Sequence, residues 1–327
     1  MARPRPMIIK SKYPSSKPRF RDYPQPRYWP AWIIIGIFRL FGLIPQRLIW
    51  HLGVLLGEIA FYLHGTPTIK TNLEMCFPEL SRDEQERLRR RYYHNIGRAF
   101  FGLGTAWYAG ARRMRRLVRV RGMEHLERAL AGKQGVLLLA PHFLCLEVGG
   151  IAMSMYIADM GNKAIGLYRK PRNPLLHQAL RYNSNHLGGE VIERYENLKV
   201  LVKAMREGSV VYYLPDQDPD RPGDDYVFAP FFGVPAATYT AFAKLARLGR
   251  AIVIPMSTRM LPGAKGYEVE LLPPMENFPT GNDQKDAERV NALIEEMVRQ
   301  SPDQYLWSYR RFKTRPGGAP SPYVRKR

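Results

Sequence analysis

The sequence predicts a single α/β domain with a largely parallel central sheet flanked by helices. From residue 135 onward, short apolar runs of four to eight residues alternate with helix-like stretches, the pattern produced by parallel strands with helical crossovers. At 327 residues the chain can hold one such domain plus an appendage. We expect strands at 135–140, 163–169, 190–194, 210–214, 251–258 and 267–272, the last at a sheet edge, with helices at 144–160, 174–186, 198–207, 237–248 and 286–300. Ahead of these, Ser81 with Glu84 three residues on is typical of a helix start, and that helix is expected to run to about Trp107.

Composition divides the chain into four segments. Residues 1–27 are rich in Pro and Arg without an apolar period, which indicates a basic disordered arm. We expect residues 28–64 to form a membrane-anchoring segment, residues 65–323 the α/β domain that carries the activity, and residues 324–327 a basic tail.

The segment 28–64 is apolar but interrupted. Tyr28, Trp29 and Trp32 stand at its front edge, as interfacial aromatic residues do, and Pro45 divides it into two halves. Neither half reaches the roughly twenty uninterrupted apolar residues of a clean span. We therefore expect membrane attachment, through one tilted transmembrane helix or an interfacial hairpin-like anchor, with a buried soluble helix as the alternative.

The charge balance is strongly basic. The formal net charge is +21, with clusters in residues 1–30, in 112–121 and in the tail from Arg310, which predicts an anionic partner such as nucleic acid, anionic lipid or an acidic protein. Two cysteines, Cys76 and Cys145, are too few for a disulfide framework and indicate a reducing compartment.

The strongest chemical signal follows the strand at 135–140. His142 comes directly after Pro141, and Glu147 lies five positions later at the head of a helix. Open α/β sheets place reactive groups just past the carboxyl ends of their strands. A neutral His held by a carboxylate there can take a proton from a hydroxyl, provided that His142 lies on the turn and Glu147 in the first turns of the helix. No His or Cys motif with zinc-ligand spacing accompanies the pair, so we expect no metal.

Polar residues also follow two other strands. Arg169 and Asn173 come after the strand at 163–169, where an arginine suits phosphate or carboxylate recognition. Asp216 and Gln217 follow the strand at 210–214 and are expected to fix a polar substrate group or a neighbouring arginine; metal binding by Asp216 with Asp218 is a weaker alternative. The aromatic Pro/Gly stretch 227–238 is expected to cap the core, or alternatively to line an acyl-chain surface.

Taken in order, these blocks resemble the bacterial lipid A late acyltransferases of the lauroyl and myristoyl type, within the glycerolipid (lysophospholipid) acyltransferase superfamily. The resemblance runs from about residue 31 to Tyr323, and the acid of its His-x4-Asp/Glu signature is here Glu147. The basic N-terminal arm is longer than the family pattern. The matching blocks are Asn72–Glu79, Ala140–Glu147, Tyr168-Arg169 with Asn173-Pro174, Pro215–Gln217, Pro230–Thr238, and Gln304–Trp307 with Arg310–Pro316.

The resemblance implies an inner-membrane enzyme whose catalytic domain faces the cytoplasm. It would move a fatty acyl group from acyl carrier protein to the hydroxyl of a hydroxyacyl chain on a Kdo-bearing lipid A precursor, in lipopolysaccharide biosynthesis. His142 would be the general base and Glu147 would orient it, while Arg169, Asn173, Asp216, Gln217 and Arg310 would contact substrate. The donor carries its own phosphopantetheine, so no further cofactor is expected.

Two other functions compete with this hypothesis. The acceptor could be a lysophospholipid or another glycolipid. A membrane-tethered nucleic-acid-binding protein would also explain the charge, but the arginine cluster 112–121 contains no aromatic residue and no nucleic-acid-binding motif is present. We therefore expect no specific nucleic acid partner.

Overall fold

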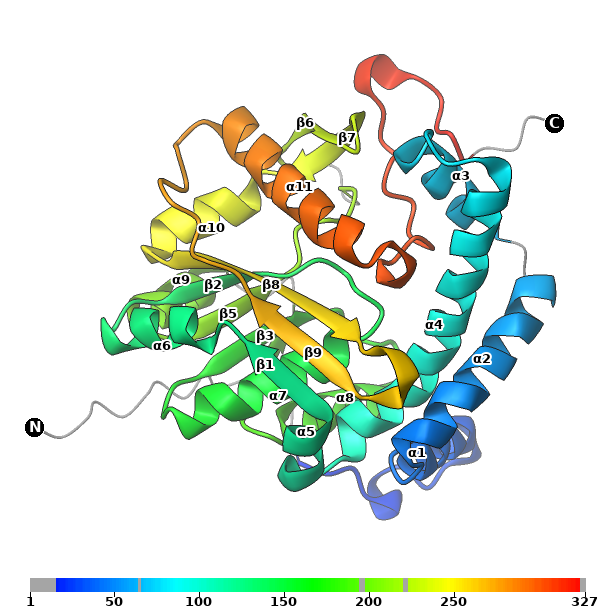
Figure 1. Cartoon of the computed structure of the whole chain (residues 1–327). Helices are drawn as coiled ribbons and strands as arrows, with labels where there is room; N and C mark the ends of the chain where they lie inside the picture. The colour runs from blue at the N-terminus through cyan, green and yellow to red at the C-terminus, as the bar shows by residue number, and fades with distance from the viewer. Residues whose placement is uncertain (1–15, 64–65, 194–197, 220–222, 324–327) are drawn as a thin grey trace, which may run out of the picture.

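A seven-stranded sheet forms the centre of the protein (Figure 1). The computed structural model describes residues 16–63, 66–193, 198–219 and 223–323. The strand order is β1-β9-β8-β2-β5-β3-β4, and every neighbouring pair is parallel except β8 with β9. With eleven α-helices in the described part, the expected α/β class with one mostly parallel sheet is confirmed. The strands are β1 (Val118–Arg121), β2 (Val136–Leu139), β3 (Ala164–Tyr168), β4 (Gly189–Glu193), β5 (Val210–Tyr213), β8 (Ile252–Met260) and β9 (Tyr267–Leu271).

One end of the sheet differs from the expectation. β9 was expected at the edge, but it lies between β8 and β1, antiparallel to the first and parallel to the second. The added strand β1 comes from the arginine-rich stretch, where Val118 and Val120 alternate with Arg119 and Arg121 and only the valines turn toward the interior. That period of two is the mark of a half-buried strand, and the charge density conceals it in the sequence.

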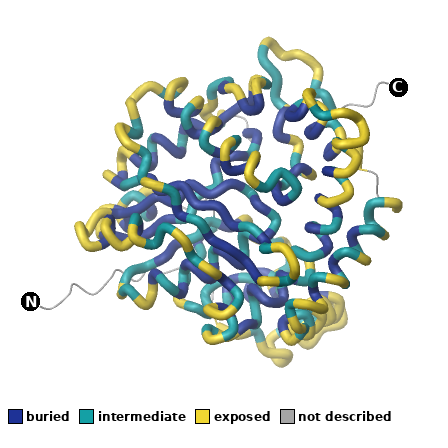
Figure 2. Tube along the Cα trace, in the orientation of Figure 1, coloured by how far each residue is buried: buried dark blue, intermediate teal, exposed yellow. Residues whose placement is uncertain are grey.

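Helices cover both faces of the sheet, and alternate strand residues point to each. On one face Leu137, Leu139 and Val211 pack with α9 (Leu198–Arg206), α10 (Ala241–Gly249) and α11 (Asp283–Gln300). On the other, Val136, Leu138 and Val210 pack with α6 (Met123–Ala131) and α7 (Leu146–Asp159). Figure 2 shows the resulting buried layer through the strands. The two remaining helices of this part are α5 (Ala111–Leu117) and α8 (Pro174–Asn185).

The aromatic stretch 227–238 is a hairpin and not an irregular loop. Strands β6 (Tyr226–Phe231) and β7 (Val234–Tyr239) pair antiparallel, joined by Phe232 and Gly233, both with positive φ. Such a two-residue turn matches the twist of the strands it joins. The expected helix at 237 therefore begins only at Ala241. Phe231 and Phe232 are buried in the main core, so the core-packing interpretation is confirmed.

The N-terminal helices pack as a separate layer beside the sheet. Gly53 and Gly57 of α2 (Gln46–Leu63) lie against Gly97 of α4 (Arg82–Tyr108), where a Cβ on Gly97 would come within 2.1 Å of the Gly53 carbonyl oxygen. The capping box predicted at Ser81 is present at the start of α4. The layer also contains α1 (Trp29–Phe41) and α3 (Pro67–Cys76).

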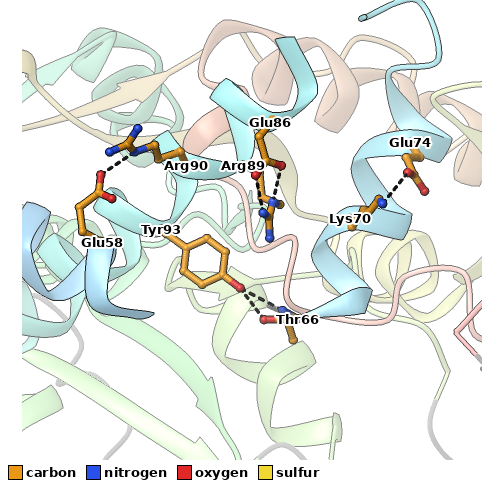
Figure 3. Close-up of polar contacts among 8 residues, drawn as sticks. All are labelled: Glu58, Thr66, Lys70, Glu74, Glu86, Arg89, Arg90 and Tyr93. Atoms are coloured by element: carbon orange, nitrogen blue, oxygen red, sulfur yellow. Dashed lines mark hydrogen bonds and ion pairs between the residues drawn. The ribbon is translucent and has the colours of Figure 1, made fainter. Parts of the chain in front are cut away.

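Polar contacts tie this layer together (Figure 3). The Arg90 side chain of α4 donates to Glu58 of α2 at 2.7 Å, and the Thr66 hydroxyl, next to α3, lies 2.7 Å from the Tyr93 hydroxyl. The hydrogen bond from Arg90 is the largest influence on the Glu58 carboxyl and lowers its pKa. The glycine contact and the Arg90–Glu58 bond hold α2 along α4, and the Thr66–Tyr93 bond joins the start of α3 to α4.

The expected membrane segment has no single helix that is long and apolar enough to span a bilayer, within the part of the chain that the structure describes. Among the described helices, α2 and α3 taken together are the one pair with sufficient length and apolar character, and they are bent by 97°.

The expected disordered arm is folded where the structure describes it, from residue 16 to 27. Its Tyr23 hydroxyl donates to Gln178 of α8 at 2.7 Å, and the Trp32 indole donates to the Tyr23 carbonyl. These aromatic anchors give an otherwise polar segment a fixed position. Residues 1–15 and the tail 324–327 lie outside the described residues.

Candidate active site

The register of the central strands brings His142 and Asp216 together. Strands β2 and β5 are parallel neighbours with Leu139 opposite Tyr213, and each chain continues three residues beyond that pair to reach His142 and Asp216. Parallel strands end at the same edge of the sheet, so the two side chains emerge side by side. Arg169 joins them because β3, which it follows, is the other neighbour of β5.

Two contacts join Asp216 to His142. The Nδ1 atom of the ring lies 2.5 Å from Oδ1 of Asp216, and the backbone N–H of His142 donates to Oδ2 at 2.8 Å. The Asp216 side chain is 2% exposed and the His142 side chain 19% exposed. The pair is therefore an almost dry carboxylate holding a ring that reaches solvent.

The surroundings keep Asp216 ionised. Burial alone would raise its pKa, but the charge and hydrogen bonds of His142, with a hydrogen bond from Tyr305, lower the pKa below its ordinary value. An ionised carboxylate only accepts hydrogen bonds, so the proton between the two side chains belongs to Nδ1 of the ring. The lone pair of a neutral His142 is then on Nε2, to which the Gln217 amide donates at 3.2 Å. This is the tautomer that a general base requires.

Segment 304–306 fixes the turn that carries His142. The Leu306 N–H donates to the His142 carbonyl and the Leu144 N–H to the Gln304 carbonyl, both at 2.9 Å. Between them Phe143 forms an isolated antiparallel bridge with Tyr305. Segment 304–306 thus holds the backbone at His142 and at Leu144, just before α7 begins.

Glu147 does not contact the ring in the expected way. It lies in the first turn of α7, where the Trp107 indole donates to its Oε1 at 3.2 Å. Among the described residues, the carboxylate on Nδ1 of His142 is Asp216. The physical reason is the strand register, which delivers Asp216 directly beside the ring, whereas Glu147 lies in the first turn of α7 against Trp107. Burial raises the pKa of Glu147, and the Trp107 hydrogen bond opposes that effect only in part.

A cavity of about 280 Å³ opens at the His142 ring. Arg169 and Gln217 line it with His142, so a base, a cation and an amide face one space. A cation there can bind an anionic substrate group or an oxyanion. Its other walls are Leu167, Tyr168, Tyr213, Leu214 and Tyr309.

A second, apolar cavity of about 190 Å³ adjoins the first, since Leu167, Tyr168, Arg169 and Leu214 line both. It runs between α7 and the sheet, with α8 and β4 also contributing to its walls. Glu147 is in its wall, and farther along α7 it is lined by Gly150, Ser154 and Ile157. A narrow apolar space beside a polar one fits a molecule with a hydrocarbon chain and a reactive polar end.

The other predicted substrate residues lie elsewhere. The Asn173 side chain caps α8 by accepting from the Leu175 and Leu176 N–H groups. Arg310 is exposed, 6.0 Å from the Tyr323 ring centroid, and lines neither cavity. Asp218 is turned away from Asp216 and accepts from the backbone and hydroxyl of Thr314, at 2.9 and 2.8 Å.

Neither a metal group nor a reactive thiol accompanies the pair. In the described ranges no three His, Cys, Asp or Glu side chains are grouped as metal ligands would be. Burial raises the pKa of Cys145 to about 12, and its thiol donates to the Thr258 carbonyl. Cys145 is thus held as a neutral thiol and is a poor nucleophile.

Three contributors were missed by the sequence reasoning: Trp107 on Glu147, Tyr305 on Asp216 and Tyr309 in the His142 cavity. Tyr305 lies inside the block Gln304–Trp307, which was noted only as part of the resemblance. For Trp107, at the end of a long helix, the sequence offers no signal.

The site defines an enzyme class. An oriented histidine base, a cation facing the same space and an adjoining hydrocarbon-shaped cavity are the parts needed to transfer an acyl group to a hydroxyl. Comparison with known proteins agrees: residues 16–314 match the family described as bacterial lipid A biosynthesis acyltransferase. The chain belongs to this family and is an O-acyltransferase of lipid A biosynthesis.

Individual relatives cover almost the whole chain. The lipid A biosynthesis lauroyltransferase of Escherichia coli K12 is 36% identical over 301 residues, which is 91% of this chain and 96% of the relative. The palmitoleoyltransferase of the same strain is 33% identical, covering 93% and 97%, and its myristoyltransferase is 27% identical, covering 94% of each. Relatives named for three different acyl chains thus align with almost the whole polypeptide, so family membership does not specify the length of the fatty acyl chain that is transferred.

Proposed function

We propose that this enzyme transfers a fatty acyl group from acyl carrier protein to the hydroxyl of a hydroxyacyl chain on a Kdo-bearing lipid A precursor. The observation that carries the proposal is the His142 ring, fixed by Asp216 and lining a cavity that also contains Arg169 and adjoins an apolar one. Family membership supports an acceptor of the lipid A type.

In the proposed reaction His142 is the base. Its Nε2 takes the proton of the acceptor hydroxyl while that oxygen attacks the thioester carbonyl, forming a C–O bond and an oxyanion. When the tetrahedral intermediate collapses, the C–S bond breaks and the proton on the imidazolium passes to the leaving thiolate. The products are an ester and a thiol, and the ionised Asp216 stabilises the imidazolium between the two steps.

Arg169 and the apolar cavity have complementary roles in this scheme. Arg169 lines both cavities, so its guanidinium would stabilise the oxyanion or bind an acidic group of the acceptor where the two spaces meet. The acyl chain would lie along α7, with its carbonyl toward His142. No further cofactor is proposed, because the phosphopantetheine arm arrives with the donor.

Attachment to the cytoplasmic side of the inner membrane is part of the proposal. Of sixteen large apolar side chains that are exposed in the described part, twelve lie between Phe20 and Leu63. On α1 these include Ile33, Ile37 and Leu40, exposed by 62, 40 and 64%. An exposed patch of this extent, next to basic residues, fits insertion at a surface of anionic lipid. Binding to anionic vesicles that is lost in Ile33→Asp/Ile37→Asp supports this attachment, and retained binding contradicts it.

The experiment that tests the proposed reaction uses purified enzyme with an acyl carrier protein thioester and a Kdo-bearing lipid A precursor. His142→Ala should lower turnover by about 10²- to 10⁴-fold without changing the melting temperature by more than a few degrees. His51→Ala, an exposed histidine on α2, is the matched control and should keep normal turnover. Near-normal turnover of His142→Ala would reject the role of the base. Faster acylation of a lysophospholipid than of the lipid A precursor would reject the acceptor.

A further inference from the structure

A groove of about 670 Å³ runs between α9 and α10, on the face of the sheet opposite α7. Its floor includes Leu198 and Leu248, whose side chains are 44 and 50% exposed. Beyond the N-terminal 63 residues, the described chain exposes only four large apolar side chains, and these two share this groove. Val202 and Leu245 complete the apolar floor.

The rim of the groove is basic. On α9, Lys199, Lys203 and Arg206 follow at intervals of four and three residues, so they form one stripe along the helix. Lys244 of α10 stands on the opposite wall. Among the described lining residues Asp225 is the one acid, and it pairs with Lys244 at 2.9 Å. Two acids outside the lining also lie near these cations: Asp283 is 3.8 Å from Lys244, and the exposed Glu207 is 4.0 Å from Lys203. A row of cations therefore flanks an apolar floor.

This combination has the features of a helix-binding groove. An amphipathic helix binds by laying apolar residues at helical spacing into a groove between two helices. Here such a helix would have to present acidic residues beside its apolar stripe, facing the α9 cations. We propose that the α9/α10 groove is the docking site for an acidic amphipathic helix of the acyl carrier protein. The proposal rests on the proposed function for the identity of its occupant.

The position of the groove agrees with that occupant. α9 leads into β5 and α10 into β8, so the N-terminal ends of both helices lie at the carboxyl edge of the sheet, where His142 and Arg169 lie. A carrier in the groove would therefore have its acyl arm directed along the same edge as the site. In Figure 1, α9 and α10 lie on the opposite side of the molecule from α1 and α2, so a soluble carrier could dock while the apolar N-terminal face contacts lipid.

The double reversal Lys199→Glu/Lys203→Glu tests the rim. Its matched control is Arg112→Glu/Arg116→Glu on α5, which changes the same charge at the same spacing on another exposed helix. At low salt we expect the KM for acyl carrier protein to rise about tenfold in the α9 variant and less than about threefold in the control. The KM for a small acyl-pantetheine donor should stay within twofold in both.

The apolar floor has its own test. Leu248→Ser should raise the KM for acyl carrier protein by about tenfold, even at salt concentrations that screen the α9 cations. Its acyl-pantetheine KM and melting temperature should match those of the wild type, because the side chain is exposed. An unchanged KM for the carrier would overturn the apolar part of the proposal.

The proposed donor and the proposed docking groove can be disproved separately. A wild-type enzyme that accepts acyl-pantetheine but transfers nothing from acyl carrier protein would overturn the proposed donor, and the occupant of the groove with it. If transfer from the carrier is normal but the α9 and α5 reversals raise KM equally, the groove alone is wrong. Equal loss of activity with both donors in the α9 variant would likewise overturn docking, because it would place the defect in the catalytic site.

Discussion

Asp216→Asn isolates the contact that distinguishes this site from a lone histidine. The substitution preserves the size of the side chain but removes the charge that faces Nδ1 at 2.5 Å and accepts from the His142 backbone at 2.8 Å. An asparagine can also turn its amide nitrogen toward the ring. The ring would then carry its proton on Nε2, where it cannot act as a base.

The expected loss follows from these two effects. A hydrogen bond to a charged group contributes about 1.5–3 kcal/mol, and 1.36 kcal/mol corresponds to a factor of ten in rate. Loss of the charge that stabilises the imidazolium therefore lowers kcat by about 10- to 150-fold. Inversion of the tautomer adds to this, and the same substitution in a Ser-His-Asp triad costs about 10⁴-fold in total. We expect kcat of Asp216→Asn to fall between these limits, by about 10²- to 10⁴-fold.

Proton NMR supplies a measurement that a merely structural role would not change. The Nδ1–H of His142, bonded to a buried carboxylate, should give a downfield resonance in the wild type that His142→Ala removes. Asp216→Asn should remove the resonance with folding intact, and Glu147→Gln should retain it. Loss of the resonance in Glu147→Gln and its survival in Asp216→Asn would refute the assignment, and so would normal turnover of Asp216→Asn.

Three further changes test other parts of the structure. Burial raises the pKa of Glu147, so its proton is bound more tightly in the folded state and wild-type stability falls as pH rises from about 4.3 through the raised pKa. Glu147→Gln lacks this loss, and its melting temperature relative to the wild type should increase from pH 4 to pH 8; a constant difference would contradict the assignment. A Cβ on Gly150 meets no atom within 4 Å and lies in the apolar cavity, so Gly150→Leu should fold normally and shift kcat/KM toward shorter donors, by about fourfold per excluded methylene. An unchanged chain preference would place the acyl chain elsewhere. Gly97→Ala should reduce the free energy of unfolding by about 1–3 kcal/mol because its Cβ meets the α2 backbone, whereas Gly36→Ala, whose Cβ meets nothing, should be neutral or stabilising in thermal denaturation.

Local patterns predicted most elements of this fold. The capping box at Ser81 starts α4 as expected, and the apolar run before Pro141 is β2. Both depend on neighbours in sequence. The β1 strand was missed and β9 was misplaced because their positions depend on pairing between residues about 150 apart. No local pattern specifies which strand lies beside which.

The dependence on strand order also explains which parts of the active site could be predicted from the sequence. His142, Asp216 and Arg169 were all identified in the sequence, because each follows an apolar run at the carboxyl end of a strand. The position of Arg169 on the same sheet edge as His142 was also expected, but the contact between Asp216 and His142 was not, because it requires β5 to lie beside β2. Without that strand order, the acid nearest in sequence, Glu147, was the natural partner to assign to His142. Proximity in sequence favoured Glu147 as the partner of His142, whereas the order of the strands places Asp216 there.

The pKa values of Asp216 and Glu147 are shifted in opposite directions, which indicates different roles for the two carboxyl groups. Asp216 has a lowered pKa because its negative charge is stabilised by His142 and by hydrogen bonds. Its carboxylate is therefore ionised and bonded to His142 before any substrate binds. Glu147 has a raised pKa because only the Trp107 indole offsets its burial beside an apolar cavity. An incompletely compensated carboxyl costs stability, and a neutral side chain of the same shape would remove that cost. Groups with pKa values driven apart in one site are characteristic of acid and base pairs in catalysis. Glu147 therefore remains a functional candidate, whose role must be one that Asp216 does not already fill.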